Sequence, residues 1–152
     1  FLAASGEAHE VESRFLTRGF FAKDAMITEF ASLSPQDDLD AAARKLLETT
    51  QQEFPVVGPG GRLEGVLTRE MLINALQKTG PQTRVANAMQ AEVETVAEAA
   101  PLMEIYELLQ LKGEPIVAVI DRSGNFVGYI NFENFSELVM MRRALEPAGQ
   151  RP

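Results

Sequence analysis

The sequence contains one pattern twice, and this repeat limits the possible folds more than any other feature. A shift of 63 positions (128 − 65) places Gly65 on Gly128 and Gly61 on Gly124 without a gap. The other pairs that the shift aligns are Ala25 with Ala88, Met26 with Met89, Leu39 with Leu102 and Leu46 with Leu109. A single gapless shift that matches turn glycines and helix leucines indicates an internal duplication.

The first copy of the clearest segment predicts a β-hairpin followed by a helix. The apolar run Phe54–Val57 is interrupted by Gly58–Gly61, which cannot continue a strand, and Leu63–Leu67 is the return strand. Thr68 then precedes helical apolar spacing over residues 69–76. Thr68 is therefore the expected N-cap, and its hydroxyl is free to bond backbone N–H groups or a ligand.

The second copy repeats this arrangement. Ile116–Ile120 and Phe126–Ile130 predict two strands on either side of an Asp-Arg-Ser-Gly turn. Asn131 takes the place of Thr68 and precedes a helix that is expected over residues 132–143. The second hairpin is therefore expected to have the same register as the first.

Each copy also predicts a strand and a helix ahead of its hairpin. In the first copy, Ala25–Ile27 is expected to begin as a strand, and Ser34–Asp37 has the Ser-Pro-x-Asp pattern of a helix start. The apolar positions expected on one face of these helices are Leu39, Ala42, Ala43, Leu46 and Leu47 in the first copy and Leu102, Ile105, Tyr106 and Leu109 in the second. Each copy is thus a β-α-β-β-α unit, and Leu46 and Leu109 are expected to be buried.

Two such units, which begin Asp-Ala-Met or Asn-Ala-Met and end Gly-apolar-apolar-Thr/Asn, resemble a tandem pair of CBS domains. The resemblance implies an α+β fold in which the units pack as a pseudo-twofold pair of small three-stranded sheets with helices on one face. It places a linker or helix at 1–22, the first unit at 23–80, the second at 81–143 and a disordered tail at 144–152.

The composition and the absence of known motifs argue against nucleic acid as a partner and against a catalytic or metal site. The net charge of −8 argues against nucleic acid, since a nucleic-acid surface needs a basic face. The chain has no Cys and a single His, His9, and the zinc-helix pattern that begins there lacks its second His because Ser13 stands at that position. Neither a Gly-x-Ser-x-Gly motif nor a P-loop is present. We expect no catalytic residues, no metal site and no required cofactor in this chain.

The resemblance instead implies a ligand site in the cleft between the units, for an adenine nucleotide or a related adenosyl compound. In such a site apolar residues enclose the base, a hydroxyl residue meets ribose or phosphate, and an Asp three positions later binds the ribose. The candidate residues are Ile27, Thr28, Pro55, Val56, Thr68, Arg69, Met71, Met89, Ala118, Asn131 and Asn134.

Both half-sites depart from the family pattern. Thr68 matches the hydroxyl position, but Met71 replaces the Asp; in the second unit these positions are Asn131 and Asn134. Because an amide can hydrogen-bond a ribose diol and a thioether cannot, the half-site with Asn134 is expected to be preferred. The alternative is structural: Thr68 and Asn131 are N-caps worth about 1 kcal/mol each, and Met71 belongs to the core.

A narrower resemblance concerns the two ends of the chain. The segments Gly6–Arg14, Lys23–Met26 and Glu133–Met140 are similar to the region that follows the last membrane helix of bacterial site-two proteases. This resemblance implies a regulatory module on the cytoplasmic side of an intramembrane zinc metalloprotease, with the peptidase residues upstream of Phe1. The family also implies a homodimer formed through the CBS helices. The alternative function is a structural dimerisation or docking module whose ligand sites are vestigial.

Overall fold

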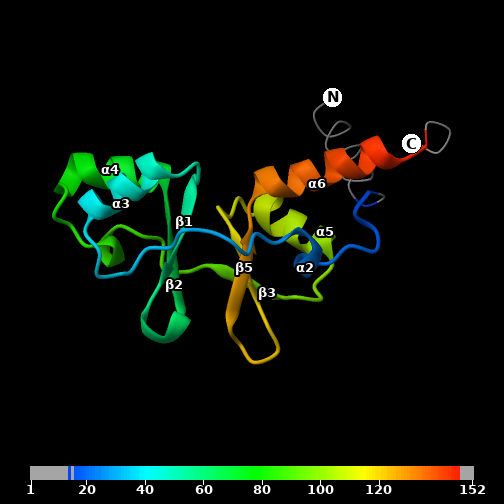
Figure 1. Ribbon diagram of the computed structural model, residues 1–152, viewed down its shortest axis with the longest axis horizontal. Helices are drawn as coiled ribbons and strands as arrows, with labels where there is room; N and C mark the ends of the chain where they lie inside the picture. The colour runs from blue at the N-terminus through cyan, green and yellow to red at the C-terminus, as the bar shows by residue number, and fades with distance from the viewer. Residues whose placement is uncertain (1–13, 15, 148–152) are drawn as a thin grey trace.

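Two similar halves lie side by side, and each consists of a β-hairpin with helices at one end (Figure 1). The computed structural model describes residues 14 and 16–147. Both hairpin turns point in one direction, and the helices α3, α4, α5 and α6 lie at the opposite end (Figure 1). The α+β fold class is therefore confirmed.

The first half is built around a two-stranded antiparallel sheet. Its elements are α3 (Leu39–Glu48), β1 (Glu53–Val57), the 3-10 turn η1 (Pro59–Gly61), β2 (Leu63–Thr68) and α4 (Arg69–Thr79). Val56 pairs with Gly65 in this hairpin. The chain turns between the strands at Gly60 and Gly61, whose φ angles of 80° and 81° favour glycine over residues with a side chain.

The second half has a third strand. Its elements are β3 (Glu94–Ala97), α5 (Leu102–Tyr106), which continues as the π-helical segment η3 (Glu107–Leu111), β4 (Val117–Ile120), β5 (Phe126–Ile130) and α6 (Phe132–Leu145). The strand order is β3-β4-β5, with β3 parallel and β5 antiparallel to β4. Val119 pairs with Gly128, and this is the register that the shift from Val56 and Gly65 predicts.

The third strand expected in the first half is reduced to a single residue. The N–H of Leu33 donates to the carbonyl of Pro55 (3.0 Å), and the N–H of Val57 donates to the carbonyl of Leu33 (2.8 Å). This parallel bridge occupies the position that β3 fills in the second half. The prediction of two three-stranded sheets is therefore wrong for the first half, where one residue makes the contact.

The sequence predicts the N-caps of two helices correctly and places the N-cap of a third helix too early. Thr68 and Asn131 cap α4 and α6, with Thr68 Oγ1 accepting from the N–H of Met71 (3.2 Å). The first helix begins later than its Ser-Pro pattern predicts. Its cap is Asp38, whose Oδ1 accepts from Ala41 N–H (2.8 Å), while Ser34–Asp37 forms a turn closed by a bond from Ser34 N–H to Asp37 Oδ2.

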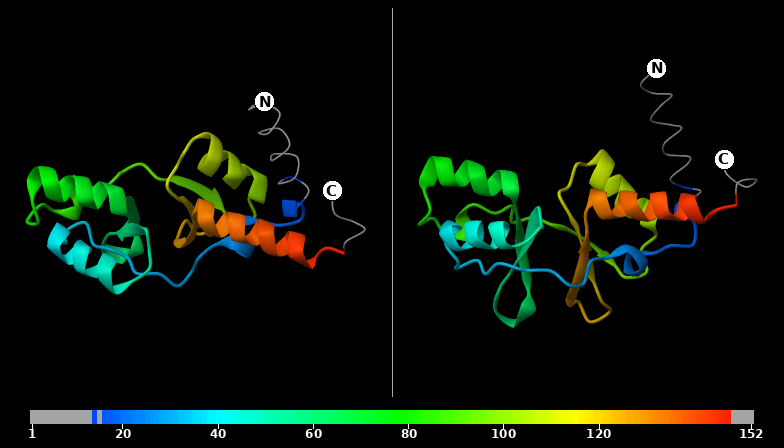
Figure 2. Two further views of the ribbon diagram at one scale, coloured as in Figure 1. Left: turned by 90° about the horizontal axis from the view of Figure 1, so that it is seen from above. Right: turned by 45° about the horizontal axis from the view of Figure 1, so that its top comes forward.

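The segment that begins each copy of the repeat packs in the core of the other half. Residues 22–27, here called lead segment 1, contain the short helix α2 (Ala22–Ala25) rather than the expected strand. Ala22 and Ala25 pack in the core of the second half. Residues 85–90, here called lead segment 2, contain the 3-10 turn η2 (Val85–Asn87), and Val85 packs in the core of the first half. The chain then crosses from α2 to α3 between the halves (Figure 2).

Each half has its own apolar core. The buried residues of the first are Leu33, Leu39, Ala42, Phe54, Val56, Leu67, Leu72 and Val85. Those of the second are Ala22, Ala25, Val96, Ala100, Leu102, Ile105, Leu109, Val117, Val119, Ile130 and Phe135. Leu109 is buried as predicted, but Leu46 is only partly buried and Leu47 is 86% exposed. The predicted apolar face of α3 is therefore too wide at its C-terminal end.

Some expectations fall outside the described residues. These are residues 1–13 and 15 of the linker or helix expected at 1–22, with His9 among them, and residues 148–152 of the expected tail. The expectation of a disordered tail from residue 144 is wrong for residues 144–145, which belong to α6. α6 extends to Leu145, two residues beyond its expected end. In the part of the chain that the structure describes, no helix has the length and apolar character needed to span a membrane.

Candidate functional site

The two copies of the repeat are joined by a reciprocal pair of backbone bridges. Ile27 of lead segment 1 exchanges two hydrogen bonds with Tyr129 of β5, at 2.8 and 3.1 Å. Gln90 of lead segment 2 exchanges two hydrogen bonds with Val66 of β2, at 2.9 and 3.0 Å. Because the shift of 63 relates Ile27 to Gln90 and Val66 to Tyr129, the two bridges are equivalent.

Glycine is required where the lead segments cross the strands. A Cβ atom on Gly65 would lie 2.6 Å from the carbonyl oxygen of Gln90 and 2.7 Å from the sulfur of Met89. A Cβ atom on Gly128 would lie 2.8 Å from the carbonyl oxygen of Ile27. Neither glycine has a positive φ, so close approach of another backbone, and not conformational freedom, explains both.

A cavity of about 180 Å³ lies where lead segment 1, β1 and the start of α6 meet. It is lined by Ile27, Glu29, Phe30, Thr50, Gln51, Gln52, Glu53, Tyr129, Asn131 and Glu133. We call it the Asn131 cavity. Two of the predicted ligand residues, Ile27 and Asn131, line this cavity. Thr28 is exposed and stands in the sequence between the lining residues Ile27 and Glu29.

The other predicted ligand residues lie elsewhere. Pro55, Val56 and Ala118 are buried within strands, and Met71 packs against the core of the first half. Met89 lies against Gly65. Arg69 is exposed and lines a separate cavity of about 150 Å³ beside the end of α3.

The amide groups of both candidate asparagines are engaged in holding the structure. Asn131 Oδ1 accepts from Asn134 N–H (2.8 Å), and Asn134 Oδ1 accepts from Asn131 N–H (2.9 Å). Asn134 Nδ2 donates to the carbonyl of Ala25, and Asn131 Nδ2 donates to Glu53 Oε2 (3.1 Å). Asn134 therefore ties α6 to lead segment 1, and Asn131 ties α6 to β1 of the other half.

The equivalent region around Thr68 has a different chemistry. Thr68 is 8% exposed and caps α4, and its neighbour Met71 faces the core. Nearby, Gln90 Nε2 donates to the carbonyl of Glu92 (2.8 Å) and to Glu114 Oε2 (3.2 Å). The two half-sites are thus equivalent in backbone and distinct in side chains.

Glu53 gives the Asn131 cavity its electrostatic character, and the sequence search did not single it out. Burial raises the pKa of the Glu53 carboxyl; the hydrogen bond from Asn131 partly opposes this, and the charges of Glu133 and Glu70 add to it. Burial, together with the nearby Glu53 charge, raises the pKa of Tyr129 to about 12. One signal could have found Glu53: it stands at the repeat position of Ile116, which is fully buried.

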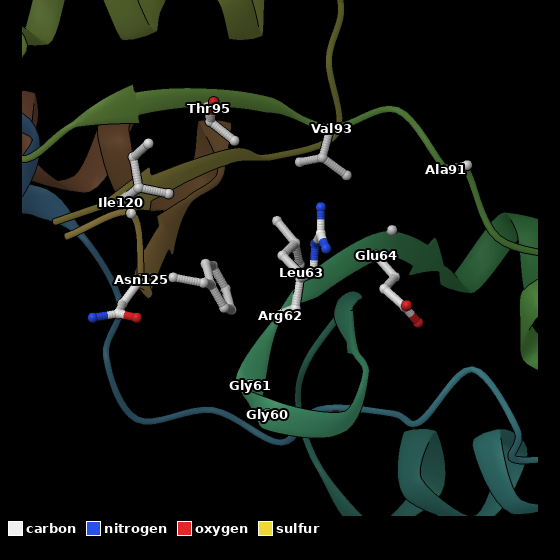
Figure 3. A pocket seen from close by; sticks show the side chains of 13 residues that line it. Gly60, Gly61, Arg62, Leu63, Glu64, Ala91, Val93, Thr95, Ile120 and Asn125 are labelled. Carbon is white, nitrogen blue, oxygen red and sulfur yellow. The ribbon is translucent and has the colours of Figure 1, made fainter. Parts of the chain in front are cut away.

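A larger open cavity, of about 430 Å³, lies between the two hairpins. Arg62, Leu63 and Val93 converge in it, whereas Glu64 points aside (Figure 3). Ile120 and Phe126 complete its apolar wall. None of the predicted ligand residues lines this cavity. In the described part of the chain, no group of three His, Cys, Asp or Glu side chains is arranged to hold a metal ion.

Comparison with known proteins gives one family match. Residues 22–78 match the model of the CBS domain. Curated relatives include the homoserine O-acetyltransferases of Methanococcoides burtonii, 25% identical over 139 residues, and of Methanosphaerula palustris, 28% identical over 145 residues. The alignments cover 91% of this chain but 28% of each relative, so the chain spans little more than a quarter of their length.

Several solved structures share the fold of nearly the whole described chain. A CBS-containing hemolysin-like protein of Oenococcus oeni superposes with a TM-score of 0.75 at 18% identity, covering 85% of this chain and 96% of that one. CBSX2 in complex with AMP gives 0.70 at 22% identity, covering 81% and 98%. The CBS domain of a bacterial CNNM/CorC family Mg²⁺ transporter in complex with ATP gives 0.76 at 16% identity, covering 89% and 97%. These likenesses establish the fold.

Proposed function

We propose that this chain, which contains a CBS domain at residues 22–78 and has the fold of CBS modules throughout, is a regulatory module that binds an adenosyl ligand between its halves. Two structures of this fold hold AMP and ATP. The observation that carries the proposal is the Asn131 cavity, whose walls come from both halves and from the segment that joins them.

The mechanism follows from where the cavity walls originate. Glu53 belongs to β1 of the first half, Asn131 caps α6 of the second, and Ile27 belongs to lead segment 1. A ligand that contacts all three favours one relative arrangement of the halves, which shifts the population towards that arrangement. An attached domain that distinguishes the arrangements would then sense whether the ligand is bound.

The attached domain has two candidates. The sequence resemblance of the chain ends supports an intramembrane zinc metalloprotease, which would place this module on the cytoplasmic side of a membrane. The curated relatives support instead a homoserine O-acetyltransferase, since the aligned region makes up 28% of the length of each relative. In either case this module regulates and does not catalyse.

The alternative is a module that only dimerises or docks. Large apolar side chains are exposed on the helices of both halves: Leu47, Ile73, Leu111, Phe132, Met140, Met141 and Leu145. These residues support a homodimer formed through the helical ends. A dimer is compatible with ligand binding, so the alternative is favoured only if no adenosyl compound binds.

A thermal-shift screen with AMP, ADP, ATP, NAD and S-adenosylmethionine separates the two functions. A ligand at 100 times its dissociation constant stabilises the folded state by about 2.7 kcal/mol, which gives a readable rise in the unfolding temperature. We expect at least one compound to give this rise. A chain that is dimeric by light scattering and gives no shift with any of the five would support the structural alternative.

A further inference from the structure

The cavity of about 430 Å³ between the two hairpins, here called the hairpin cavity, shares no lining residue with the Asn131 cavity. Small-molecule sites of roughly 300–1,000 Å³ typically have apolar walls and a few polar groups at fixed positions. The apolar side chains of the hairpin cavity are those of Leu63, Val93, Ile120 and Phe126, and each is partly buried. Its size and walls are therefore those of a site for a small molecule.

The two copies of the repeat differ in the side chain that lies beside the hairpins. The shift of 63 relates Phe30 to Val93. The ring of Phe30 lies 5.6 Å from the ring of Phe126 and 5.1 Å from that of Tyr129. Val93 has no ring, and the hairpin cavity opens beside it. The place that an aromatic side chain fills in one copy is thus open in the other, so an aromatic ligand group would complete the packing.

Arg62 supplies a positive charge at this cavity. Its side chain converges with those of Leu63 and Val93 (Figure 3) and forms no ion pair or hydrogen bond with the part of the chain that the structure describes. The residue at its repeat position is Asn125, whose Nδ2 donates to Asp121 Oδ2 (3.2 Å) and closes its own turn. The fold makes no such use of the Arg62 guanidinium, which has the geometry to pair with a carboxylate.

Glu64 also lines the hairpin cavity, but it does not neutralise Arg62. Its side chain points aside in Figure 3, and its carboxyl group lies beside Gly58, where a Cβ atom would approach it to 2.7 Å. Gly58 does not line the cavity. In a chain with a net charge of −8, the hairpin cavity therefore presents a positive group next to an apolar wall.

We propose that the hairpin cavity binds a small aromatic carboxylate, whose ring packs against Leu63, Val93 and Phe126 and whose carboxylate pairs with Arg62. A single guanidinium matches the single charge of a carboxylate, whereas a phosphate dianion would bring a second negative charge near Glu64. This site is separate from the proposed adenosyl site, and neither depends on the other.

Titration of the full chain with 3-phenylpropionate, followed by two-dimensional amide NMR, tests where such a compound binds. We expect saturable shifts over residues 61–65, 91–95 and 120–126, which surround the hairpin cavity. Shifts confined to residues 27–30 and 129–134, or no saturable shift, would overturn the proposal.

Two related compounds separate the contribution of the ring from that of the charge. 3-Phenylpropionamide keeps the ring and lacks the charge, and we expect it to bind at least fivefold more weakly than the acid. Propionate keeps the charge and lacks the ring, and we expect it to bind at least tenfold more weakly. Equal affinities for acid and amide would show that Arg62 does not select the ligand.

The variant Arg62→Gln should weaken 3-phenylpropionate binding at least fivefold and leave the amide nearly unchanged. Arg122→Gln is the matched control, because Arg122 is an exposed arginine of the second hairpin turn that does not line the cavity. It removes the same charge from the chain and should change neither affinity. Equal effects of the two variants on the acid would contradict a pairing with Arg62.

The variant Val93→Phe places in this copy the ring that Phe30 provides in the other. It should fill the hairpin cavity and abolish binding of both the acid and the amide, while binding of an adenosyl compound at the Asn131 cavity should not change. Undiminished binding of 3-phenylpropionate to the folded variant would overturn the proposal. If the variant does not fold, the Arg62→Gln and Arg122→Gln pair decides. Failure of the proposal in any of these tests leaves the adenosyl function untouched.

Discussion

Ile27 and Tyr129 exchange two backbone hydrogen bonds although they lie near opposite ends of the described chain. The equivalent exchange between Gln90 and Val66 makes the contact reciprocal. Each half is completed by the lead segment of the other copy, so neither copy of the repeat has its full core alone. The module should therefore unfold as one cooperative unit.

Gly65→Ala should disrupt this contact. The new Cβ would lie 2.6 Å from the backbone carbonyl of Gln90, which cannot move without breaking the bridge to Val66. Overpacking of this kind costs about 1–3 kcal/mol. Urea denaturation measures the loss, and Gly128→Ala should give a loss of similar size because its neighbour is the carbonyl of Ile27.

Gly58→Ala is the control for these two variants. Its φ is negative, and the three atoms nearest to its new Cβ would all belong to the carboxyl group of Glu64, an exposed side chain that can turn away. It should cost clearly less than Gly65→Ala. Equal losses in the two variants would show that the close crossing of the lead segment is not what requires glycine.

Leu109→Ala should destabilise the second half strongly. Leu109 is 5% exposed and packs in that core, and removal of a buried leucine side chain costs about 2–5 kcal/mol. Leu47→Ala is the matched control, since Leu47 is 86% exposed and should change the unfolding free energy by at most about 0.5 kcal/mol. Similar losses for both, measured by denaturant unfolding, would contradict the observed helix faces.

Asn134→Asp should destabilise the protein although Asp is the residue that the family pattern places there. One carboxylate oxygen can still accept from Asn131 N–H, but the other would face the carbonyl of Ala25, which now accepts from the amide. Loss of this donor should cost about 1–3 kcal/mol in thermal or denaturant unfolding. Unchanged stability would show that the amide is free to serve a ligand.

Glu53→Gln should stabilise the protein at pH 7. Burial raises the pKa of Glu53 in the folded state, so the folded state binds its proton more tightly than the unfolded state does. The stability that Glu53 contributes is present below its unfolded pKa of about 4.5 and is lost as the pH rises through the folded value. The advantage of glutamine should therefore be largest at pH 7 and disappear near pH 4.

Thermal unfolding of the two proteins across this pH range checks the prediction. The side chains that act on Glu53 are those of Asn131, Glu133 and Glu70, and all three remain in the variant. Glu53 itself raises the pKa of Tyr129. Glu64→Gln, which removes one negative charge at an exposed position of the cavity between the hairpins, serves as the control for the loss of charge alone. A stability advantage of Glu53→Gln that is constant with pH, or that grows towards pH 4, would contradict the prediction.

The repeat allowed the hairpins, their register and the caps Thr68 and Asn131 to be predicted, because turn glycines and cap residues act through local geometry. The exchange of lead segments could not be predicted. Met26 and Met89 are aligned by the shift, but alignment does not say which half each contacts. The only sequence sign of the exchange is the pair of glycines opposite these methionines, Gly65 and Gly128, because the absence of a side chain allows another backbone to approach.

The sequence placed its candidate site between the units, and two of the candidate residues, Ile27 and Asn131, line the Asn131 cavity; that they bind a ligand stays a prediction. Asn134 was treated as free to bind ribose, but its amide already holds lead segment 1. Side-chain hydrogen bonds across the fold, such as those of Asn131 and Asn134, leave no periodic signal. Leu47 was assigned to the core because apolar spacing on α3 cannot show where the partner surface ends.

The most direct test of the central claim is where an adenosyl ligand binds. Two-dimensional amide NMR spectra recorded during titration with S-adenosylmethionine would show this residue by residue. We expect the largest shifts over residues 27–30, 50–53 and 129–134, which surround the Asn131 cavity. Shifts confined to the hairpin turns, over residues 60–65 and 124–126, or no shifts at saturating ligand, would contradict the account.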